Sequence, residues 1–567
     1  MIAPLFALFV TAAELPLHYQ RLLEAGSAKV QARLDAEPNA DLKTIEATPG
    51  WRHFPYAILA PAVLYSRDPA NTKMRDLALR IGDLLARESA SGAYEPRGDS
   101  DWDDYMWLEA WRLLGPALGD ERRARWRREI EKNIALLEQD ARDRVDFPWY
   151  NSPYTGTSPN HYALWAANLY LGGKLFGNAE WEALGSRILK RFATVEQTED
   201  GYWGEHSRNG PTAGYNHLTL SALAVYYEHS GDPVILPALR RALDFHEHFT
   251  FLDGTPVDVV NDRNRHWNVS AWSQFAFTHF ADGRGYAAWL ASFFKPETLT
   301  IDALGRLAQD ALYFHEGPAE PPPALRDSYS LRMKQAPAGI RKSGPWQWAL
   351  SGVIDTQAIN SRFYLDRQSH ASIFHRDTGL IVTGANSKRQ PELATFNETV
   401  NGALVHMPLS SRLQMTPEQD RLSLAYNTFF ADLFVGPVQG DALPVRFVIS
   451  GRGTPGPDTR LNLQLCLRAG EDLVMASSER VKIGAEHVEL GPAQLGRRIR
   501  HHGWTLELPE GASLSWPVHP HNPYADAPET AIEYAVGRLT VPIPLQARKG
   551  KYVRANEREL AFRITVP

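Results

Sequence analysis

From about Leu15 to Leu312, hydrophobic residues recur with the period of about 3.6 that is typical of helices. These helical stretches are interrupted where glycine or an acidic residue is followed by residues that favour helix starts. The interruptions are 51 to 58 residues apart, at Asp68, Gly119, Gly177, Gly231 and Asp282. A repeat of this length with two helices in each unit predicts stacked helical hairpins.

Two kinds of helix alternate within the repeat. Segments such as YALWAANLYLGG and TLSALAVYYE are apolar on nearly all sides, which is typical of helices buried all round. Their partners, such as RILKRFATVEQ, have one polar face. Apolar inner helices ringed by amphipathic outer helices predict an (α/α) toroid over residues 15–315, with about five or six hairpins. An open α-solenoid is the structural alternative.

The pattern changes in the second half of the chain. Beyond residue 355, runs such as LPVRFVISG and HGWTLELPE alternate with a period of about two, which is the strand period. We therefore expect an antiparallel β-sandwich over residues 355–567. Residues 316–354 contain the proline-rich run EGPAEPPPALRD and predict a linker. The predicted fold class is an N-terminal (α/α) toroid followed by a C-terminal antiparallel β-sandwich.

Composition excludes several classes of protein. The chain of 567 residues has 60 basic and 66 acidic residues, so its formal charge of −6 argues against nucleic-acid binding, which requires clustered cations. Hydrophobic residues make up 44% and charged residues 22%, which is typical of a folded protein and not of a disordered one. The single cysteine, Cys466, excludes an internal disulfide and a cysteine-based zinc site.

The N-terminus carries the one apolar segment that could contact a membrane. The run IAPLFALFVTAA, residues 2–13, is too short to cross a bilayer, which takes about 20 residues. It is similar to the apolar region of a secretory signal, with Thr11 and Ala13 as small residues before a cleavage point. We expect residues 1–14 to be a signal peptide, with a secreted or periplasmic product and no stable membrane insertion. A buried N-terminal helix is the alternative.

Candidate functional residues follow from the toroid itself. Loops that lead into the inner helices of a toroid meet at one end, so polar residues just ahead of apolar helices are the ones expected to share a site. Three successive loops carry such residues: Asn160 and His161 in the first, His206, Arg208 and Tyr215 in the second, and Arg263 and Arg265 in the third.

This combination of side chains suits β-elimination from a uronic acid. The C-5 proton of a uronate is too weakly acidic to be removed until the charge of the adjacent carboxylate is offset. An asparagine amide or an arginine guanidinium can offset that charge and stabilise the enolate-like intermediate. A histidine or tyrosine can then remove the proton, and a tyrosine hydroxyl can protonate the leaving oxygen. The chemistry requires no metal and no cofactor.

The same residues carry a resemblance to known lyases. Asn160 and His161, followed by Arg208 after 48 residues and Tyr215 after seven more, resemble the motif of the toroid-type alginate lyases. His206 with Tyr215 nine residues later, and an arginine pair one hairpin on, is similar to the chondroitin and hyaluronate lyases. The expected toroid and β-domain also resemble the heparinase-like lyases.

The resemblance implies roles for these residues. Asn160 would neutralise the substrate carboxylate with help from Arg208, His161 or His206 would be the base, and Tyr215 would be the acid, or both acid and base in a syn elimination. Which histidine is the base stays open. The run FNETVNG resembles an Asn/Glu-rich loop of these lyases. By the same resemblance Arg263, Arg265 and Glu398 are assigned to substrate binding. Trp149 and Trp203 are assigned to it because they lie near loop ends, where they are expected to stack on sugar rings. The implied partner is an anionic, uronate-containing polysaccharide.

Two other functions compete with this interpretation. An inverting or unsaturated-uronyl glycoside hydrolase on a toroid would need two opposed carboxylates, for which Asp103 or Asp104 and Glu205 are candidates. A non-catalytic protein that binds carbohydrate through its β-domain would need neither Tyr215 nor His161. The uronate, its linkage and endo or exo action stay open.

Overall fold

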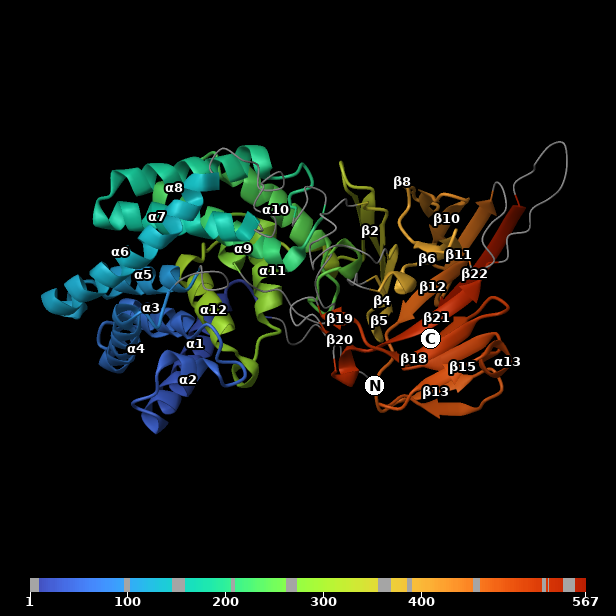
Figure 1. The fold of residues 1–567 in the computed structure, drawn as a ribbon, viewed down its shortest axis with the longest axis horizontal. Coiled ribbons are helices and arrows are strands. Elements are labelled where there is room, and N and C mark those ends of the chain that lie inside the picture. Colours follow the sequence, from blue (N-terminus) through green and yellow to red (C-terminus); the bar gives the residue numbers. More distant parts are fainter. Residues whose placement is uncertain are drawn as a thin grey trace. The chain divides into compact units, whose positions relative to one another are not determined.

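The computed structural model divides the chain into two compact units, shown as a ribbon in Figure 1. The first, here called the helical unit, comprises Met1–Trp203, Gly214–Glu247 and Val269–Pro322; the second, the β unit, comprises Gly204–Ala213, His248–Asn268 and Pro323–Pro567. The structure describes residues 10–95, 102–144, 159–204, 210–261, 273–354, 369–384, 390–451, 459–522, 527–528, 530–543 and 556–567. Each unit is described by itself.

The helical unit contains the paired helices that the repeat predicts. Its α-helices are α1 (Leu15–Ala36), α2 (Leu42–Glu46), α3 (Leu59–Arg67), α4 (Thr72–Ser91), α5 (Asp103–Leu114), α6 (Gly119–Arg144), α7 (Pro159–Phe176), α8 (Ala179–Arg191), α9 (Ala213–Ser230), α10 (Leu236–His248), α11 (Ala281–Ala291) and α12 (Ile301–Tyr313). The short 3₁₀ helices η2 (Phe54–Ile58) and η8 (Gln274–Phe277) precede α3 and α11. None of the helices within the described residues combines the length and the apolar character needed to cross a bilayer.

Most of the predicted interruptions separate helices. Asp68 caps the end of α3, and Gly119 begins α6. Gly177 and Gly231 follow α7 and α9 with φ of 80° and 65°, a left-handed conformation that ends helices and favours glycine. Asp282 differs, because it lies within the first turn of α11 and not between helices.

Inner helices α5, α7, α9 and α12 run in the same direction. Tyr170 of α7 packs edge-on against Tyr226 of α9, with ring centroids 4.5 Å apart, and Lys174 one turn later contacts the carbonyl of His229. Near the ends of α5, α9 and α12, the His229 Nε2 atom lies 2.9 Å from Glu109 Oε1 and 2.8 Å from the Tyr313 hydroxyl. All these contacts join residues in the C-terminal halves of the four helices. Their N-termini therefore lie together at the opposite end of the helical unit.

The β unit consists of two large antiparallel sheets. Within the described residues, one sheet has 11 strands: β1 (Ser328–Arg332), β2 (Ala338–Ser343), β3 (Trp346–Ser351), β4 (Ala371–His375), β5 (Gly379–Thr383), β6 (Phe396–Val400), β7 (Ala403–Val405), β12 (Arg460–Leu465), β15 (Val488–Leu490), β18 (Ser513–Val518) and β21 (Val536–Pro542). The other described sheet has nine: β8 (Ser410–Met415), β9 (Asp420–Ala425), β10 (Phe429–Val435), β11 (Ala442–Gly451), β13 (Asp472–Met475), β14 (Arg480–Lys482), β16 (Arg498–His501), β17 (Trp504–Glu507) and β22 (Asn556–Thr565). Short strands β19 (His521–Asn522) and β20 (Ala527–Pro528) pair with each other.

The hydrophobic core of the β unit lies between the two large sheets. Phe396 of β6 meets Phe447 of β11 edge-on at 5.8 Å. Trp348 of β3 is buried and donates its indole N–H to Asp420 Oδ2 of β9 at 2.8 Å. Side chains from both sheets therefore interdigitate, which confirms the predicted sandwich.

The predicted linker over residues 316–354 is wrong in its second half. Strands β1, β2 and β3 lie there and form the edge of the 11-stranded sheet as an antiparallel meander. Every residue of β3 is buried. The glycine and proline that suggested a linker are turn residues, since Gly344 has φ of 57° in the tight turn between β2 and β3.

The predicted domain boundary also differs from the observed units. Residues 204–213 and 248–268, which we expected in the toroid, belong to the β unit. Phe251 stacks on Phe374 of β4 with ring centroids 5.0 Å apart. The buried Asp258 carboxylate accepts hydrogen bonds from the Ser372 and Thr383 hydroxyls and, at 2.9 Å, from the Gly384 N–H. The two units are therefore interleaved in sequence.

Candidate functional site

The sequence-predicted residues that fall in the described part of the helical unit gather at one end of it. Asn160 is the second residue of α7, and Tyr215 is the third residue of α9. Asp103 begins α5. Because these inner helices are parallel, the three positions share the end of the unit at which the inner helices begin.

Asn160 is a buried amide in the first turn of an inner helix. Its side chain is 2% exposed, and among the described residues its Oδ1 atom has no hydrogen-bond partner. An unpaired buried amide is costly, by about 1 to 3 kcal/mol, and therefore needs a reason. At the first turn of α7 the backbone N–H groups and the helix dipole also favour a negative charge. His161, the next residue, is partly exposed.

The first turn of α9 holds Tyr215 between fixed neighbours. The side chain of Asn216 is 2% exposed; its Oδ1 accepts from the backbone N–H of Trp203 at 3.0 Å, and its Nδ2 donates to His246 Nε2 at 2.7 Å. The His246 ring is tilted by 31° against the His217 ring, with ring centroids 4.0 Å apart. Burial, with a smaller contribution from the charge of His217, holds the pKa of His246 well below its usual value, so the ring is neutral and can accept this hydrogen bond.

Trp203, which we expected to contact sugar rings, is a core residue. Its side chain is 1% exposed, and its indole N–H donates to the carbonyl of Phe192 at 2.9 Å. The ring has no free face, so the assignment of Trp203 to substrate binding is withdrawn. Its position near a loop end suggested a platform for sugar rings, but the side chain is part of the core.

Several predicted residues lie outside the described residues: His206, Arg208, Arg263, Arg265, Trp149 and Glu205. Their roles stay predictions. Glu398 is described and lies on β6 in the β unit, where it is fully buried. One oxygen of its carboxylate accepts from the Thr428 hydroxyl, while the other has no hydrogen-bond partner among the described residues.

The paired carboxylates at the start of α5 have different surroundings. Asp104 is fully buried, and its Oδ1 accepts from the Tyr94 hydroxyl at 3.0 Å and from Asn133 Nδ2 at 3.1 Å. Burial, helped by the nearby charge of Asp103, raises the pKa of Asp104 to about 7. Asn133 belongs to the outer helix α6, so Asp104 is directed outward, away from the inner helices.

Asp103 faces a histidine that the sequence analysis missed. The His53 Nδ1 atom lies 3.3 Å from Asp103 Oδ1, and His53 adopts a left-handed backbone conformation with φ of 60°. Burial alone would lower the pKa of His53, but hydrogen bonding to Asp103 and the charge of that residue raise it. His53 precedes the apolar stretch of η2 and α3, so the criterion that selected the other loops could have found it.

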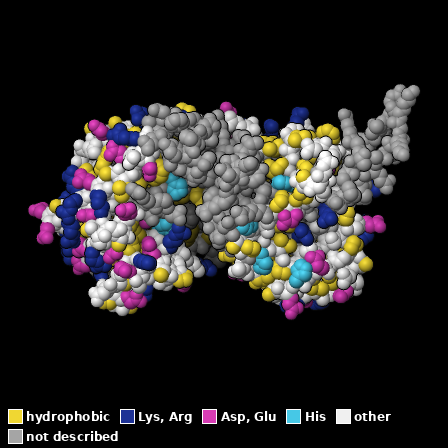
Figure 2. Space-filling view, in the orientation of Figure 1, with side chains coloured by type: hydrophobic (Ala, Val, Ile, Leu, Met, Phe, Trp, Pro, Cys, Tyr) yellow, Lys and Arg dark blue, Asp and Glu magenta, His cyan; other side chains and the backbone are white. Residues whose placement is uncertain are grey.

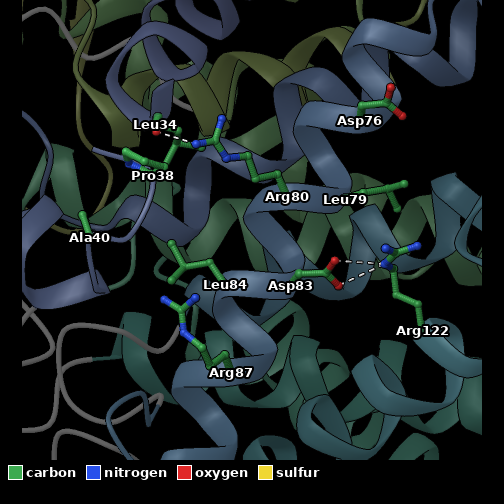
Figure 3. A pocket seen from close by; sticks show the side chains of 10 residues that line it. All are labelled: Leu34, Pro38, Ala40, Asp76, Leu79, Arg80, Asp83, Leu84, Arg87 and Arg122. Atoms are coloured by element: carbon green, nitrogen blue, oxygen red, sulfur yellow. Dashed lines mark hydrogen bonds and ion pairs between the residues drawn. The ribbon is translucent and has the colours of Figure 1, made fainter. Parts of the chain in front are cut away.

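A separate pocket of about 450 Å³ lies near α1, α4 and α6 and carries three arginines, Arg80, Arg87 and Arg122 (Figure 3). The Arg122 Nε atom lies 3.0 Å from Asp83 Oδ1, and Arg80 contacts Asp35 and the carbonyl of Leu34. Each of these arginines contacts a carboxylate of the protein, with Arg87 paired to Glu88. Figure 2 likewise shows basic and acidic side chains interspersed on the visible face of the helical unit.

The chain thus belongs to the class of proteins that combine a toroid of paired helices with an antiparallel β-sandwich. The polar side chains of the candidate site lie where the inner helices of the toroid begin. A solved chondroitinase AC lyase shares this fold, with a TM-score of 0.51, 10% identity, and coverage of 98% of this chain and 83% of that one. The resemblance seen in the sequence is thus confirmed at the level of the fold.

Two further solved structures are similar. A heparan sulfate lyase from Pedobacter heparinus has a TM-score of 0.47 and 12% identity over 91% of this chain and 76% of its own. A mutant chondroitin AC lyase from Streptomyces coelicolor A3 has a TM-score of 0.49 and 13% identity over 96% and 79%. No protein-family model matches the sequence, and no curated protein matches it.

Proposed function

We propose that this protein is a polysaccharide lyase that cleaves a uronate-containing glycan by β-elimination. The observation that carries the proposal is the position of Asn160, a buried amide in the first turn of α7, at the same end of the helical unit as Tyr215. The fold shared with a chondroitinase AC lyase supports it, and favours a glycosaminoglycan as the substrate class.

In the proposed reaction, the substrate carboxylate occupies the space beside the Asn160 amide and the first turn of α7. The amide and the helix start offset its charge, which lowers the pKa of the C-5 proton. A base, His161, His206 or Tyr215 itself, removes that proton, and the electron pair of the broken C–H bond forms the C-4=C-5 double bond. The C-4–O-4 bond breaks, and the Tyr215 hydroxyl gives its proton to O-4. The products are a 4,5-unsaturated uronate and a new chain end.

Asn216 and His246 are positioning residues in this proposal. Their hydrogen bond fixes the first turn of α9 against α10, and the bond from the Trp203 N–H fixes the segment before it. Such support keeps a reacting hydroxyl within reach of the leaving oxygen, where a misplacement of about 1 Å can cost about 100-fold in rate. The expected signal peptide over residues 1–14 makes export part of the proposal.

The test is ultraviolet absorbance of the unsaturated product. The purified protein is incubated with chondroitin, hyaluronan, heparan sulfate, alginate and poly-glucuronate. A rise in absorbance on one of them is expected, and Tyr215→Phe lowers that rate at least about 100-fold because acid and base catalysis is lost. The matched control is Tyr226→Phe, on the same helix α9 but at its other end, where the hydroxyl donates to Asp232 Oδ2. Wild-type rates in Tyr215→Phe would remove Tyr215 from the mechanism.

A hydrolase is the second candidate, because Asp103 begins α5 at the end of the helical unit where the inner helices start. A glycosidase needs two opposed carboxyl groups, one of which serves as the general acid. Hydrolysis gives new reducing ends without ultraviolet absorbance, so the same incubations separate the two functions. In that event Asp103→Asn abolishes the release of reducing ends, and Tyr215→Phe does not.

A further inference from the structure

Two histidines and a glutamate meet at the end of the helical unit where the inner helices stop. Glu228 lies in the last turns of α9, His279 lies between η8 and α11, and His315 follows α12. The His315 Nε2 atom is 2.8 Å from Glu228 Oε1, and the His279 Nε2 atom is 3.1 Å from the same oxygen. One donor atom from each of the three side chains lies within 4.8 Å of the others.

This cluster is poorly explained as a set of hydrogen bonds. Both imidazoles direct Nε2 at a single carboxylate oxygen, and their rings lie 4.0 Å apart. Although His279 Nε2 is close to Glu228, it is buried and has no hydrogen bond of acceptable geometry within the described residues. A bound cation would use the lone pair on each Nε2.

The geometry is close to that of a metal site. Tetrahedral zinc holds nitrogen and oxygen ligands at about 2.0 to 2.1 Å, which places ligand atoms about 3.3 Å apart. The contacts of 2.8 and 3.1 Å need to open by only a few tenths of an ångström to admit such an ion. Two imidazoles and one carboxylate form a donor set that suits zinc and related divalent transition metals.

The protein already supports these donors. The His315 backbone N–H donates to Thr278 Oγ1 at 3.1 Å, which ties the two histidine segments together. Tyr227 packs edge-on against His279, with ring centroids 4.9 Å apart. The side chains of Glu228 and His279 are 12% and 10% exposed, and that of His315 is 40% exposed, so an ion could reach the cluster from solvent through His315.

We propose that Glu228, His279 and His315 bind one divalent transition-metal ion of the zinc class. The site is separate from the proposed lyase chemistry, because 13 positions of a helix place Glu228 about 20 Å along α9 from Tyr215. The neighbouring His229 does not join it, since its Nε2 contacts Glu109 and Tyr313. The ion clamps α9 to the segments that flank α11 and α12, so its role is structural.

The test is metal binding to the full chain after treatment with a chelator. Titration calorimetry with Zn²⁺ is expected to give one ion per chain, and Co²⁺ to give the intense visible bands of a four- or five-coordinate site. His315→Ala and, as a second variant, His279→Gln each lower the affinity at least tenfold and abolish the rise in melting temperature that Zn²⁺ causes. Ligand loss of this kind removes one of three protein bonds to the ion.

The control variant is His487→Ala. His487 Nε2 lies 3.2 Å from Glu489 Oε1 in an exposed pair with one histidine only, so its loss leaves zinc binding unchanged. The proposal is overturned if Zn²⁺ does not bind with saturation, or if both variants bind it as tightly as the wild type. These readouts do not depend on activity, so they are independent of the lyase proposal.

Discussion

Asn160 combines a stability cost with a proposed role in binding. Its buried Oδ1 has no hydrogen-bond partner among the described residues, and a buried acceptor left unpaired destabilises the folded state. Replacing Asn160 should therefore lower the reaction rate without lowering the stability of the fold.

We predict that Asn160→Ala lowers the rate of substrate cleavage by about 100- to 1,000-fold, the usual cost of removing one donor to a developing anion. Its melting temperature is expected to equal or exceed that of the wild type, since the substitution removes an unpaired polar group. Initial rates and thermal unfolding check both parts. A variant that is less stable by more than about 2 kcal/mol would show that the amide has a structural role.

Some residues of the candidate site could be predicted from the sequence, and others could not. Asn160 and Tyr215 could be selected from the sequence because each stands directly before or within the first turn of an apolar helix. His246 could not, because it lies near the end of the outer helix α10 and reaches Asn216 only through the antiparallel return of that helix. Trp203 was misread because a loop aromatic gives no sign of whether it faces inward.

At the scale of elements, the ends of α5, α9 and α12 are joined by one ionised network. Glu109 is fully buried and contacts His229, Tyr313 and, at 2.7 Å, the Nε atom of Arg112. Burial alone would raise the pKa of Glu109, but the hydrogen bond from His229 and the charges of Arg112 and His229 lower it from 4.5 to about 2. The carboxylate is thus stabilised in its charged form.

This network predicts an acid-sensitive contribution to stability. Because the folded-state pKa of Glu109 lies below the unfolded value, its contribution is complete above about pH 4.5 and is lost as the pH falls toward 2. Glu109→Gln is expected to lower the free energy of unfolding by about 3 kcal/mol at pH 7, since Arg112 loses its buried partner. The difference between variant and wild type should shrink below pH 4.5. Urea unfolding at several pH values measures it; a constant difference would contradict the assignment.

The helices were easier to predict than the strands for a physical reason. An inner helix such as α7 is buried over almost its whole length, so its apolar run stands out in the sequence. Strand β3 is also wholly buried, but it has only six residues and follows a proline, which hid it within an apparent linker. The metal-type cluster has no sequence signature, because Glu228, His279 and His315 come from three distant segments.

At the scale of the whole molecule, segments of the helical unit alternate along the sequence with segments of the β unit. Residues 204–213 and 248–268 leave the helical part of the sequence and become part of the β unit. Within the β unit, the Asp258 carboxylate ties residues 248–268 to the sheet, since it accepts from residues on and next to β4 and β5. Neither unit is therefore a continuous stretch of sequence.

We predict that Asp258→Ala destabilises the β unit by about 3 kcal/mol, because three buried donors lose their acceptor. Asp253→Ala is the matched control in the same segment. Its carboxylate accepts only from Thr255 among the hydrogen bonds described, so the loss should be smaller. Urea unfolding of both full-length variants measures the difference. Equal destabilisation would show that the bonds to β4 and β5 do not anchor this segment.

The interleaving of the two units also sets an order of events during synthesis on the ribosome. Asp258 precedes its partner Ser372 by 114 residues, and a ribosome adding about 5 to 20 residues per second needs roughly 6 to 23 seconds to cover that distance. During this interval Phe251 has no Phe374 ring to stack on. The apolar segment at residues 248–268 therefore stays exposed on the nascent chain after most of the helical hairpins have been synthesised. Chaperones that bind exposed apolar segments are expected to bind it during this interval.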